Sequence, residues 1–106
     1  MTAIISQAKI PASQRLIVAL DFPTWEQASK LVDRLDNVTF FKVGLEMFLS
    51  SRGQAVEHLR ARGKKVFLDL KFHDIPNTVA QACRQIVPLG VDICNVHALG
   101  GKSMME

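Results

Sequence analysis

The sequence predicts an α/β fold built around a parallel sheet. Four short apolar runs recur along the chain, and each is about the length of a strand that is covered on both faces. The runs are residues 16–20, 38–41, 66–70 and 91–96. Stretches of helical character separate them, and helical crossovers between consecutive strands imply parallel pairing with right-handed connections. The predicted order of elements is therefore β-α-β-α-β-α-β.

The first two crossovers are predicted as helices on different grounds. Thr24-Trp25-Glu26-Gln27 resembles a capping box, which predicts a helix that begins there and reaches about Leu35. Residues 46–62 have the composition of a helix, but the segment 51–53 is expected to break it. Gly63 suits the position just after the end of that second helical stretch.

The third crossover begins with a proline. Pro76 suits the first turn of a helix, and this helix should end before Pro88. A fourth helix is expected to start within residues 100–106.

Two architectures fit this order of elements, a doubly wound open sheet and a (β/α)8 barrel. A barrel typically needs about 250 residues, so a chain of 106 residues with this order corresponds to about half of one. We therefore expect residues 1–106 to form the N-terminal half of a single (β/α)8 (TIM) barrel domain, about its first four βα units. Residues 1–14 are expected to be an N-terminal extension.

The composition narrows the class of protein. With 48% hydrophobic and 22% charged residues the chain is globular, and its net charge of +3 mildly favours anionic ligands such as phosphate esters. The densest basic stretch, residues 60–65, contains no aromatic residue for base stacking and suits a helix C-terminus, so we expect no nucleic-acid binding.

The chain is also expected to be a cytoplasmic protein. No apolar stretch is long enough for a signal peptide or a membrane span, so we expect no contact with a membrane. Cys83 and Cys94 have no metal-binding spacing and are predicted to be buried, reduced thiols.

Strand parity predicts where the polar side chains gather. Side chains alternate along a strand, so Phe67, Asp69 and Lys71 should share one face. The inward face of each strand starts apolar and becomes polar at its carboxyl end, where barrel active sites lie. The apolar residues of this face are Ile17, Phe40, Phe67 and Ile93. The residues expected to converge at one rim are Asp21, Lys42, Asp69, Lys71 and His97, and Asn95 shares the row of His97.

Each of these residues also has an ordinary structural explanation. Asp21, before Phe22-Pro23, could serve only in a turn. Lys42 could extend its charged end to solvent, and a single histidine such as His97 is more often structural than catalytic. Asp69 with Lys71 is harder to explain in this way, because two inward charges each need a partner.

Several segments together resemble those of a known family. Asp69-x-Lys71-x-x-Asp74 resembles the signature of the orotidine 5'-phosphate decarboxylase suprafamily, and the following Ile75-Pro76-Asn77-Thr78 is similar to its bacterial decarboxylases. Three further segments match in order and spacing, and the resemblance covers the chain from Leu16 onward. These segments are Val18-Ala19-Leu20-Asp21, Phe41-Lys42-Val43-Gly44 and Asn95-Val96-His97-Ala98-Leu99-Gly100-Gly101.

The resemblance implies a decarboxylation of orotidine 5'-phosphate to uridine 5'-phosphate in pyrimidine biosynthesis, without cofactor or metal. It implies that Lys71 protonates C6 of the pyrimidine as carbon dioxide leaves. Asp69 would lie beside the leaving carboxylate and fix Lys71. Lys42 and Asp74 would complete a Lys-Asp-Lys-Asp array. Such a reaction has no electron sink, so placed charge has to stabilise the carbanion.

The resemblance also implies a homodimer with shared sites. Asp74, Ile75 and Thr78 would reach the partner's site, while Asp21 and Lys42 would hold ribose hydroxyls. His97 matches a position near the site but receives no chemical role. The segment expected to line the substrate pocket comprises Asp69, Leu70, Lys71, Phe72, His73, Asp74, Ile75, Pro76, Asn77 and Thr78.

Two alternatives remain open at this point. An enzyme of the same suprafamily could act on sugar phosphates as a decarboxylase or aldolase, with magnesium, although Lys42 and the segment after Asp74 disfavour it. A non-catalytic half barrel could instead associate with itself through its exposed edge strands. In the family the phosphate grip and the loop over the pyrimidine come late in the barrel, beyond Glu106. The isolated 106-residue chain is therefore expected to be inactive.

Overall fold

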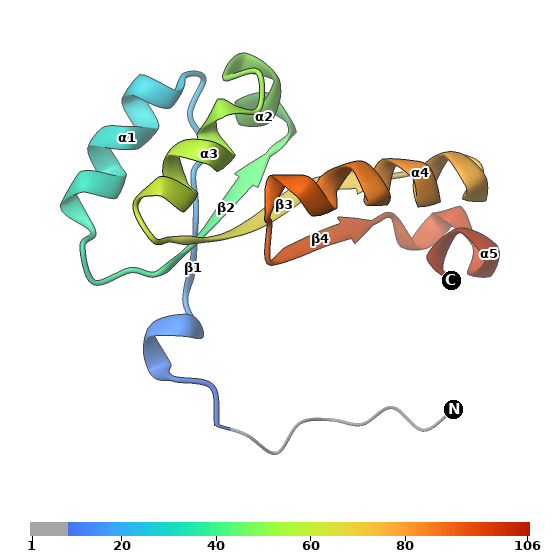
Figure 1. Cartoon of the computed structure of the whole chain (residues 1–106), viewed down its shortest axis with the longest axis horizontal. Helices are drawn as coiled ribbons and strands as arrows, with labels where there is room; N and C mark the ends of the chain where they lie inside the picture. Colours follow the sequence, from blue (N-terminus) through green and yellow to red (C-terminus); the bar gives the residue numbers. More distant parts are fainter. Residues whose placement is uncertain (1–8) are drawn as a thin grey trace.

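The computed structural model describes residues 9–106 and contains one parallel sheet of four strands (Figure 1). The strands are β1 Ile17–Ala19, β2 Phe40–Gly44, β3 Lys65–Phe72 and β4 Ile93–Val96. They lie side by side in sequence order, and each pairs in parallel with the next. A doubly wound sheet reverses direction at a switch point, whereas a barrel adds each strand on the same side. The sequential order therefore matches the four βα units of a barrel.

The helices occupy the predicted crossovers. They are α1 Trp25–Arg34, α2 Leu45–Ser50, α3 Gln54–Ala61, α4 Pro76–Ile86 and α5 Lys102–Met105, with 3-10 turns η1 Ala12–Gln14, η2 Val87–Leu89 and η3 Ala98–Gly100. The hydroxyl of Thr24 accepts the N–H of Gln27 at 3.3 Å, which confirms the predicted N-cap. The predicted break at residues 51–53 separates α2 from α3, and Pro76 is the first residue of α4.

The strands β2 and β3 continue past their predicted carboxyl ends, through charged residues. β2 begins at Phe40 and runs to Gly44, and β3 extends to Phe72. The predicted runs stop earlier because the next residues are the charged Lys42 and Lys71. A charged side chain at the carboxyl end of a strand still belongs to the ladder when its charge finds a partner. A prediction from apolar residues alone therefore places the carboxyl ends of these strands too early.

One face of the sheet forms the core beneath the helices. α1, α2, α3 and α4 lie on the same side of the strands (Figure 1). Fully buried strand residues meet fully buried helix residues there, and each large apolar side chain so buried contributes about 1.5 to 3 kcal/mol. The strand residues are Phe41, Val43, Val66 and Leu68, Leu20 directly follows β1, and the helix residues include Ala28, Val32, Met47, Val56 and Leu59.

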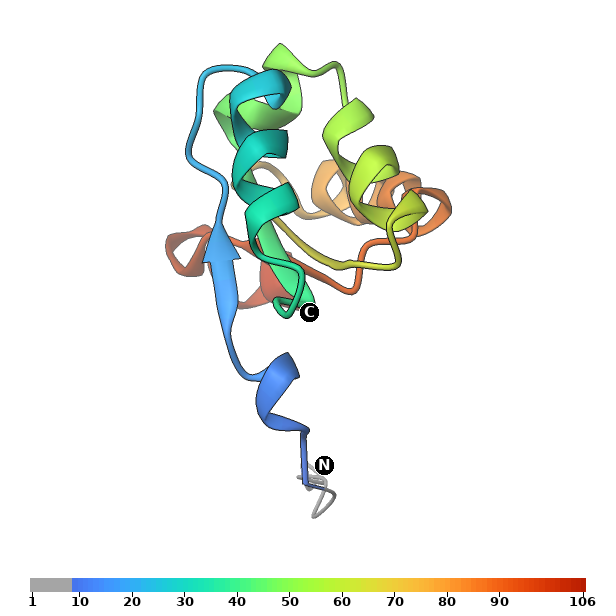
Figure 2. The ribbon, with the colours of Figure 1, turned by 90° about the vertical axis from the view of Figure 1, so that its left-hand side faces the viewer.

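The opposite face is partly open to solvent. Ile17 and Ile93 expose 37% and 42% of their surface, and Phe67 is half-buried. Phe40 differs from its neighbours on this face, because it is 7% exposed. Among the described residues β1 and β4 are the edge strands, and η1 extends beyond β1, away from the helices (Figure 2).

Several smaller expectations can also be placed. Residues 1–8 of the predicted N-terminal extension lie outside the described part. The prediction of buried thiols is wrong for Cys94, which is exposed on edge strand β4, while Cys83 is half-buried. Partial burial and the adjacent Cys83 thiol nonetheless raise the pKa of Cys94. Within residues 9–106, every helix is too short or too polar to cross a membrane.

Candidate active site

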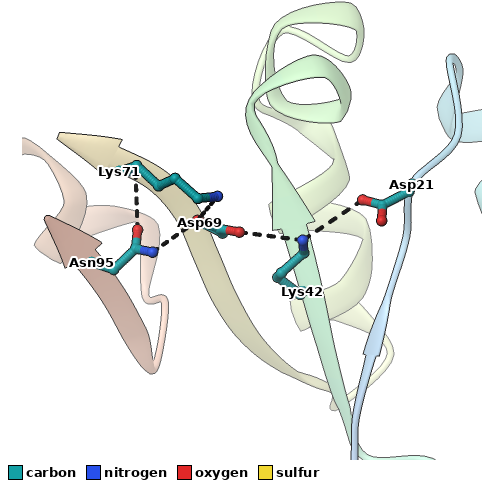
Figure 3. Close-up of polar contacts among 5 residues, drawn as sticks. All are labelled: Asp21, Lys42, Asp69, Lys71 and Asn95. Carbon is teal, nitrogen blue, oxygen red and sulfur yellow. Dashed lines mark hydrogen bonds and ion pairs between the residues drawn. The ribbon is translucent and has the colours of Figure 1, made fainter. Parts of the chain in front are cut away.

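A cavity of about 440 Å³ lies at the carboxyl ends of β1, β2 and β3. Four residues predicted to lie at the rim line it, together with residues of the loop before α1 and the first turn of α2. The lining residues are Leu20, Asp21, Phe22, Lys42, Gly44, Leu45, Glu46, Met47, Asp69, Leu70 and Lys71. The structure thus brings together four of the five residues expected to converge: Asp21, Lys42, Asp69 and Lys71 (Figure 3).

Asp69 is the centre of a chain of ion pairs. Its Oδ1 lies 2.7 Å from the Nζ of Lys71 and its Oδ2 lies 3.2 Å from the Nζ of Lys42. The same Lys42 Nζ lies 3.7 Å from Oδ1 of Asp21. Asp69 is only 7% exposed, whereas the side chains of Lys71 and Asp21 are largely exposed. One buried carboxylate therefore orients two ammonium groups at the edge of the cavity.

These contacts keep Asp69 ionised. The pKa of Asp69 is lowered from 3.8 to about 2, and the hydrogen bond from Lys71 is the largest cause. Burial acts in the opposite direction, and hydrogen bonds from Asn95 and Lys42 also favour the ionised form. A carboxylate held by donors on both oxygens stays charged near neutral pH and gives Lys71 a fixed negative neighbour.

Lys71 occupies an unusual backbone conformation. Its φ angle is +49°, in the left-handed region that non-glycine residues rarely adopt. The pairing of β3 with β4 is irregular at this point, between Leu68 and Phe72. Such a conformation costs about 1 to 3 kcal/mol and persists only where the surroundings impose it, commonly at functional sites.

The rest of the segment expected to line the pocket leaves the cavity after Lys71. Leu70 lines it with Asp69 and Lys71, but the seven residues that follow do not. These are Phe72, His73, Asp74, Ile75, Pro76, Asn77 and Thr78, and all except the half-buried Phe72 are exposed. The carboxylate of Asp74 accepts the N–H of Ile75 at 2.7 Å. Pro76 lines a separate cavity of about 210 Å³ beside α4 and α5.

His97 does not reach the main cavity. β4 ends at Val96, so strand parity no longer fixes the direction of His97. Its ring stacks on His73 with 4.8 Å between ring centroids, and its Nδ1 accepts the N–H of Leu99 at 3.1 Å. His97 therefore caps η3 instead of joining Lys42 and Asp69.

Two residues of the site were missed in the sequence. Asn95 bonds to both Asp69 and Lys71, and its place in the inward row of β4 was the available signal. Glu46 lines the cavity from the first turn of α2, where nothing distinguishes it from an ordinary exposed helix residue. No group of three His, Cys, Asp or Glu residues within residues 9–106 is arranged to hold a metal ion.

Fold and site together define a barrel-type α/β protein with a charged cavity at the carboxyl edge of its parallel sheet. Comparison of the sequence with family models agrees with that class and narrows it. The model of the orotidine 5'-phosphate decarboxylase / HUMPS family matches residues 14–106, and the chain belongs to this family.

Relatives named orotidine 5'-phosphate decarboxylase share about half of the aligned residues. The protein from Halorhodospira halophila is 55% identical over 98 residues, which is 92% of this chain and 42% of the relative. The protein from Chromobacterium violaceum is 50% identical over 107 aligned positions, which is all of this chain and 43% of the relative.

Solved structures of proteins with the same name share the fold of this chain over a similar fraction of their length. The crystal structure of orotidine 5'-phosphate decarboxylase from Lactobacillus acidophilus matches with a TM-score of 0.77 at 43% identity, covering 85% of this chain and 41% of that one. The decarboxylase from Pyrococcus horikoshii OT3 matches with a TM-score of 0.75 at 29% identity, covering 85% and 45%. The chain therefore spans less than half the length of the relatives and structures it matches.

Proposed function

We propose that the protein carrying this chain decarboxylates orotidine 5'-phosphate to uridine 5'-phosphate in pyrimidine biosynthesis. The family and the names of its relatives supply the substrate. The observation that carries the proposal is the row Lys42, Asp69 and Lys71, with one ionised carboxylate between two ammonium groups at 3.2 and 2.7 Å. A carbanion without an electron sink requires such fixed charge.

Lys71 is the proposed proton donor. When the bond between C6 and the substrate carboxylate breaks, carbon dioxide leaves and the electron pair stays on C6. The ammonium group of Lys71 then gives its proton to C6, and the neutral amine regains a proton from water. Asp69 holds that ammonium at 2.7 Å, so the donor is positioned before the bond breaks. Asp69 would also lie beside the substrate carboxylate.

Asp21 and Lys42 are proposed to hold the ribose hydroxyls. Asp21 is exposed at the cavity, and Lys42 bridges it to Asp69. The cavity volume of about 440 Å³ lies within the range of about 300 to 1,000 Å³ that is usual for small-molecule sites. The cavity is therefore large enough for a small ligand beside both residues.

We further propose that Asp74, Ile75 and Thr78 serve the site of a second subunit in a homodimer. All three are exposed in this chain, and Ile75 exposes 66% of its surface. None of them lines the cavity of its own chain. Their exposure supports a role toward a partner.

The test is turnover of orotidine 5'-phosphate by the protein expressed from its native gene. We expect uridine 5'-phosphate and carbon dioxide in equal amounts, at the same rate with EDTA and with added magnesium. Absence of this turnover would contradict the proposal. A magnesium-dependent reaction with a sugar phosphate would instead favour the alternative, a sugar-phosphate decarboxylase or aldolase of the same suprafamily.

A further inference from the structure

The ladder between β3 and β4 has a gap directly beside the charged array. Leu68 pairs with Cys94 and Phe72 pairs with Val96, so residues 69–71 of β3 lie opposite the single residue Asn95 of β4. A bulge of this kind leaves backbone groups of the longer strand without a partner in the opposite strand. The N–H of Lys71 is such a group.

The side chain of Asn95 fills this gap (Figure 3). Its Oδ1 accepts the backbone N–H of Lys71 at 3.0 Å, and its Nδ2 donates to Oδ1 of Asp69 at 2.8 Å. The same oxygen of Asp69 accepts the Nζ of Lys71 at 2.7 Å. One amide therefore contacts both the backbone of Lys71 and the carboxylate that holds the ammonium group of Lys71.

We propose that Asn95 is a positioning residue, which fixes Lys71 in its left-handed backbone conformation and orients Asp69 toward the Lys71 ammonium group. The catalytic consequence rests on the proposed function, but the structural part does not. At neutral pH an amide of this length supplies an acceptor for the N–H and a donor for the carboxylate together. An aspartate would keep the acceptor and place a second carboxylate against Asp69, and a leucine would supply neither group.

This role predicts a specific kinetic pattern. Asn95 is not among the residues that line the cavity, so its loss should leave substrate binding nearly unchanged. Misplacement of Lys71 lowers the rate of the chemical step. A displacement of about 1 Å costs on the order of 100-fold in kcat. A residue that only supported the fold would lower the amount of active protein and leave the pH dependence of kcat unchanged.

The experiment compares Asn95→Leu and Asn95→Asp with the matched control Asn37→Asp, an exposed asparagine in the loop before β2. We expect kcat to fall on the order of 100-fold in Asn95→Leu with KM within about threefold of wild type. In Asn95→Asp, kcat should recover toward acidic pH, because a protonated carboxylic acid can again donate to Asp69. The control should match wild type at every pH.

A second measurement does not depend on turnover. Titration of the Asp69 carboxyl carbon by NMR should show a higher pKa in Asn95→Leu than in wild type, because one donor to the carboxylate is lost. An active wild type with unchanged kcat and unchanged Asp69 titration in both Asn95 variants overturns this inference alone. An inactive wild type whose Asp69 titration still depends on Asn95 overturns the proposed function and supports the positioning role. If Asn95→Leu does not fold, Asn95→Asp alone tests the inference. An unchanged titration of Asp69 and no recovery of kcat at acidic pH in that variant would overturn it.

Discussion

The two faces of the four-stranded sheet differ in almost every property. The face beneath the helices is apolar, and four of its strand residues, together with Leu20 directly after β1, are completely buried. The opposite face carries the charged residues of β2 and β3 at its carboxyl end and partly exposed Ile17 and Ile93 elsewhere. Residues on the two faces alternate along the same strands, so adjacent positions such as Leu68 and Asp69 serve different purposes.

The difference indicates that stability and chemistry are separable in this protein. The covered face gains its stability from apolar contacts between the strands and the helices that connect them. On the charged face, Lys71 and Asp21 add little to stability themselves, because much of their surface stays in water. Only the buried carboxylate of Asp69 is expected to contribute. Substitutions on the covered face should therefore mainly change the free energy of unfolding, and substitutions of the exposed charged residues should mainly change turnover.

The largest effect is expected for Lys71→Ala. General acid catalysis contributes about 10² to 10⁴-fold, so kcat should fall by at least that factor. The side chain of Lys71 is 60% exposed, so the melting temperature should fall less than it does when a buried leucine is truncated. Steady-state kinetics and thermal melts of the native protein measure both, with Lys30→Ala, an exposed lysine of α1, as the control. Turnover near the wild-type rate in Lys71→Ala would contradict the assignment.

The reverse pattern is expected for Leu68→Ala on the covered face. Leu68 is fully buried, and truncation of a buried leucine costs about 2 to 5 kcal/mol through lost transfer energy and the cavity that remains. The expected result in urea unfolding is a loss of that size, with kcat per folded molecule unchanged. Leu49→Ala is the matched control, because Leu49 is 65% exposed and should cost less than about 0.5 kcal/mol. Equal losses in the two variants would show that the covered face is not the core.

The covered face could be predicted from the sequence almost completely. Apolar runs, the cap at Thr24 and the proline at the start of α4 are local signals, and the structure follows them. The charged face could be predicted only where parity holds. Parity places Lys42 and Asp69 correctly, but it fails for His97, which lies beyond the end of β4.

The bulge at Lys71 shows what sequence patterns leave out. Its left-handed backbone depends on a side chain of another strand, 24 residues away in sequence. No local pattern of β3 encodes that contact. The position of Asn95 was visible in the inward row, but its two hydrogen bonds follow from the irregular register between β3 and β4.

A moderate effect is expected from the titration of Asp69. Its pKa is lowered from 3.8 to about 2, so the folded state binds fewer protons than the unfolded state in this range. The resulting stability of about 2 kcal/mol is present above pH 4 and is lost as the pH falls toward 2. Urea unfolding of wild type and Asp69→Asn over this range should show a difference between the two that shrinks by about 2 kcal/mol. The exposed Asp36→Asn serves as control, and a difference that stays constant with pH would contradict the pKa.

The smallest effect concerns residues 73–78, which belong neither to the covered core nor to the charged cavity. If Asp74 completes the site of a partner subunit, Lys71→Ala and Asp74→Ala proteins are each inactive but carry complementary defects. After random exchange half of the dimers are mixed, and one of the two sites in each mixed dimer holds both Lys71 and Asp74. Turnover should therefore recover to about a quarter of the wild-type value. Exchange is confirmed by mass spectrometry of differently tagged subunits, and each variant mixed with itself is the control. Confirmed mixed dimers without recovery would mean that Asp74 acts in its own chain or not at all, and the charged array would then be complete without a partner.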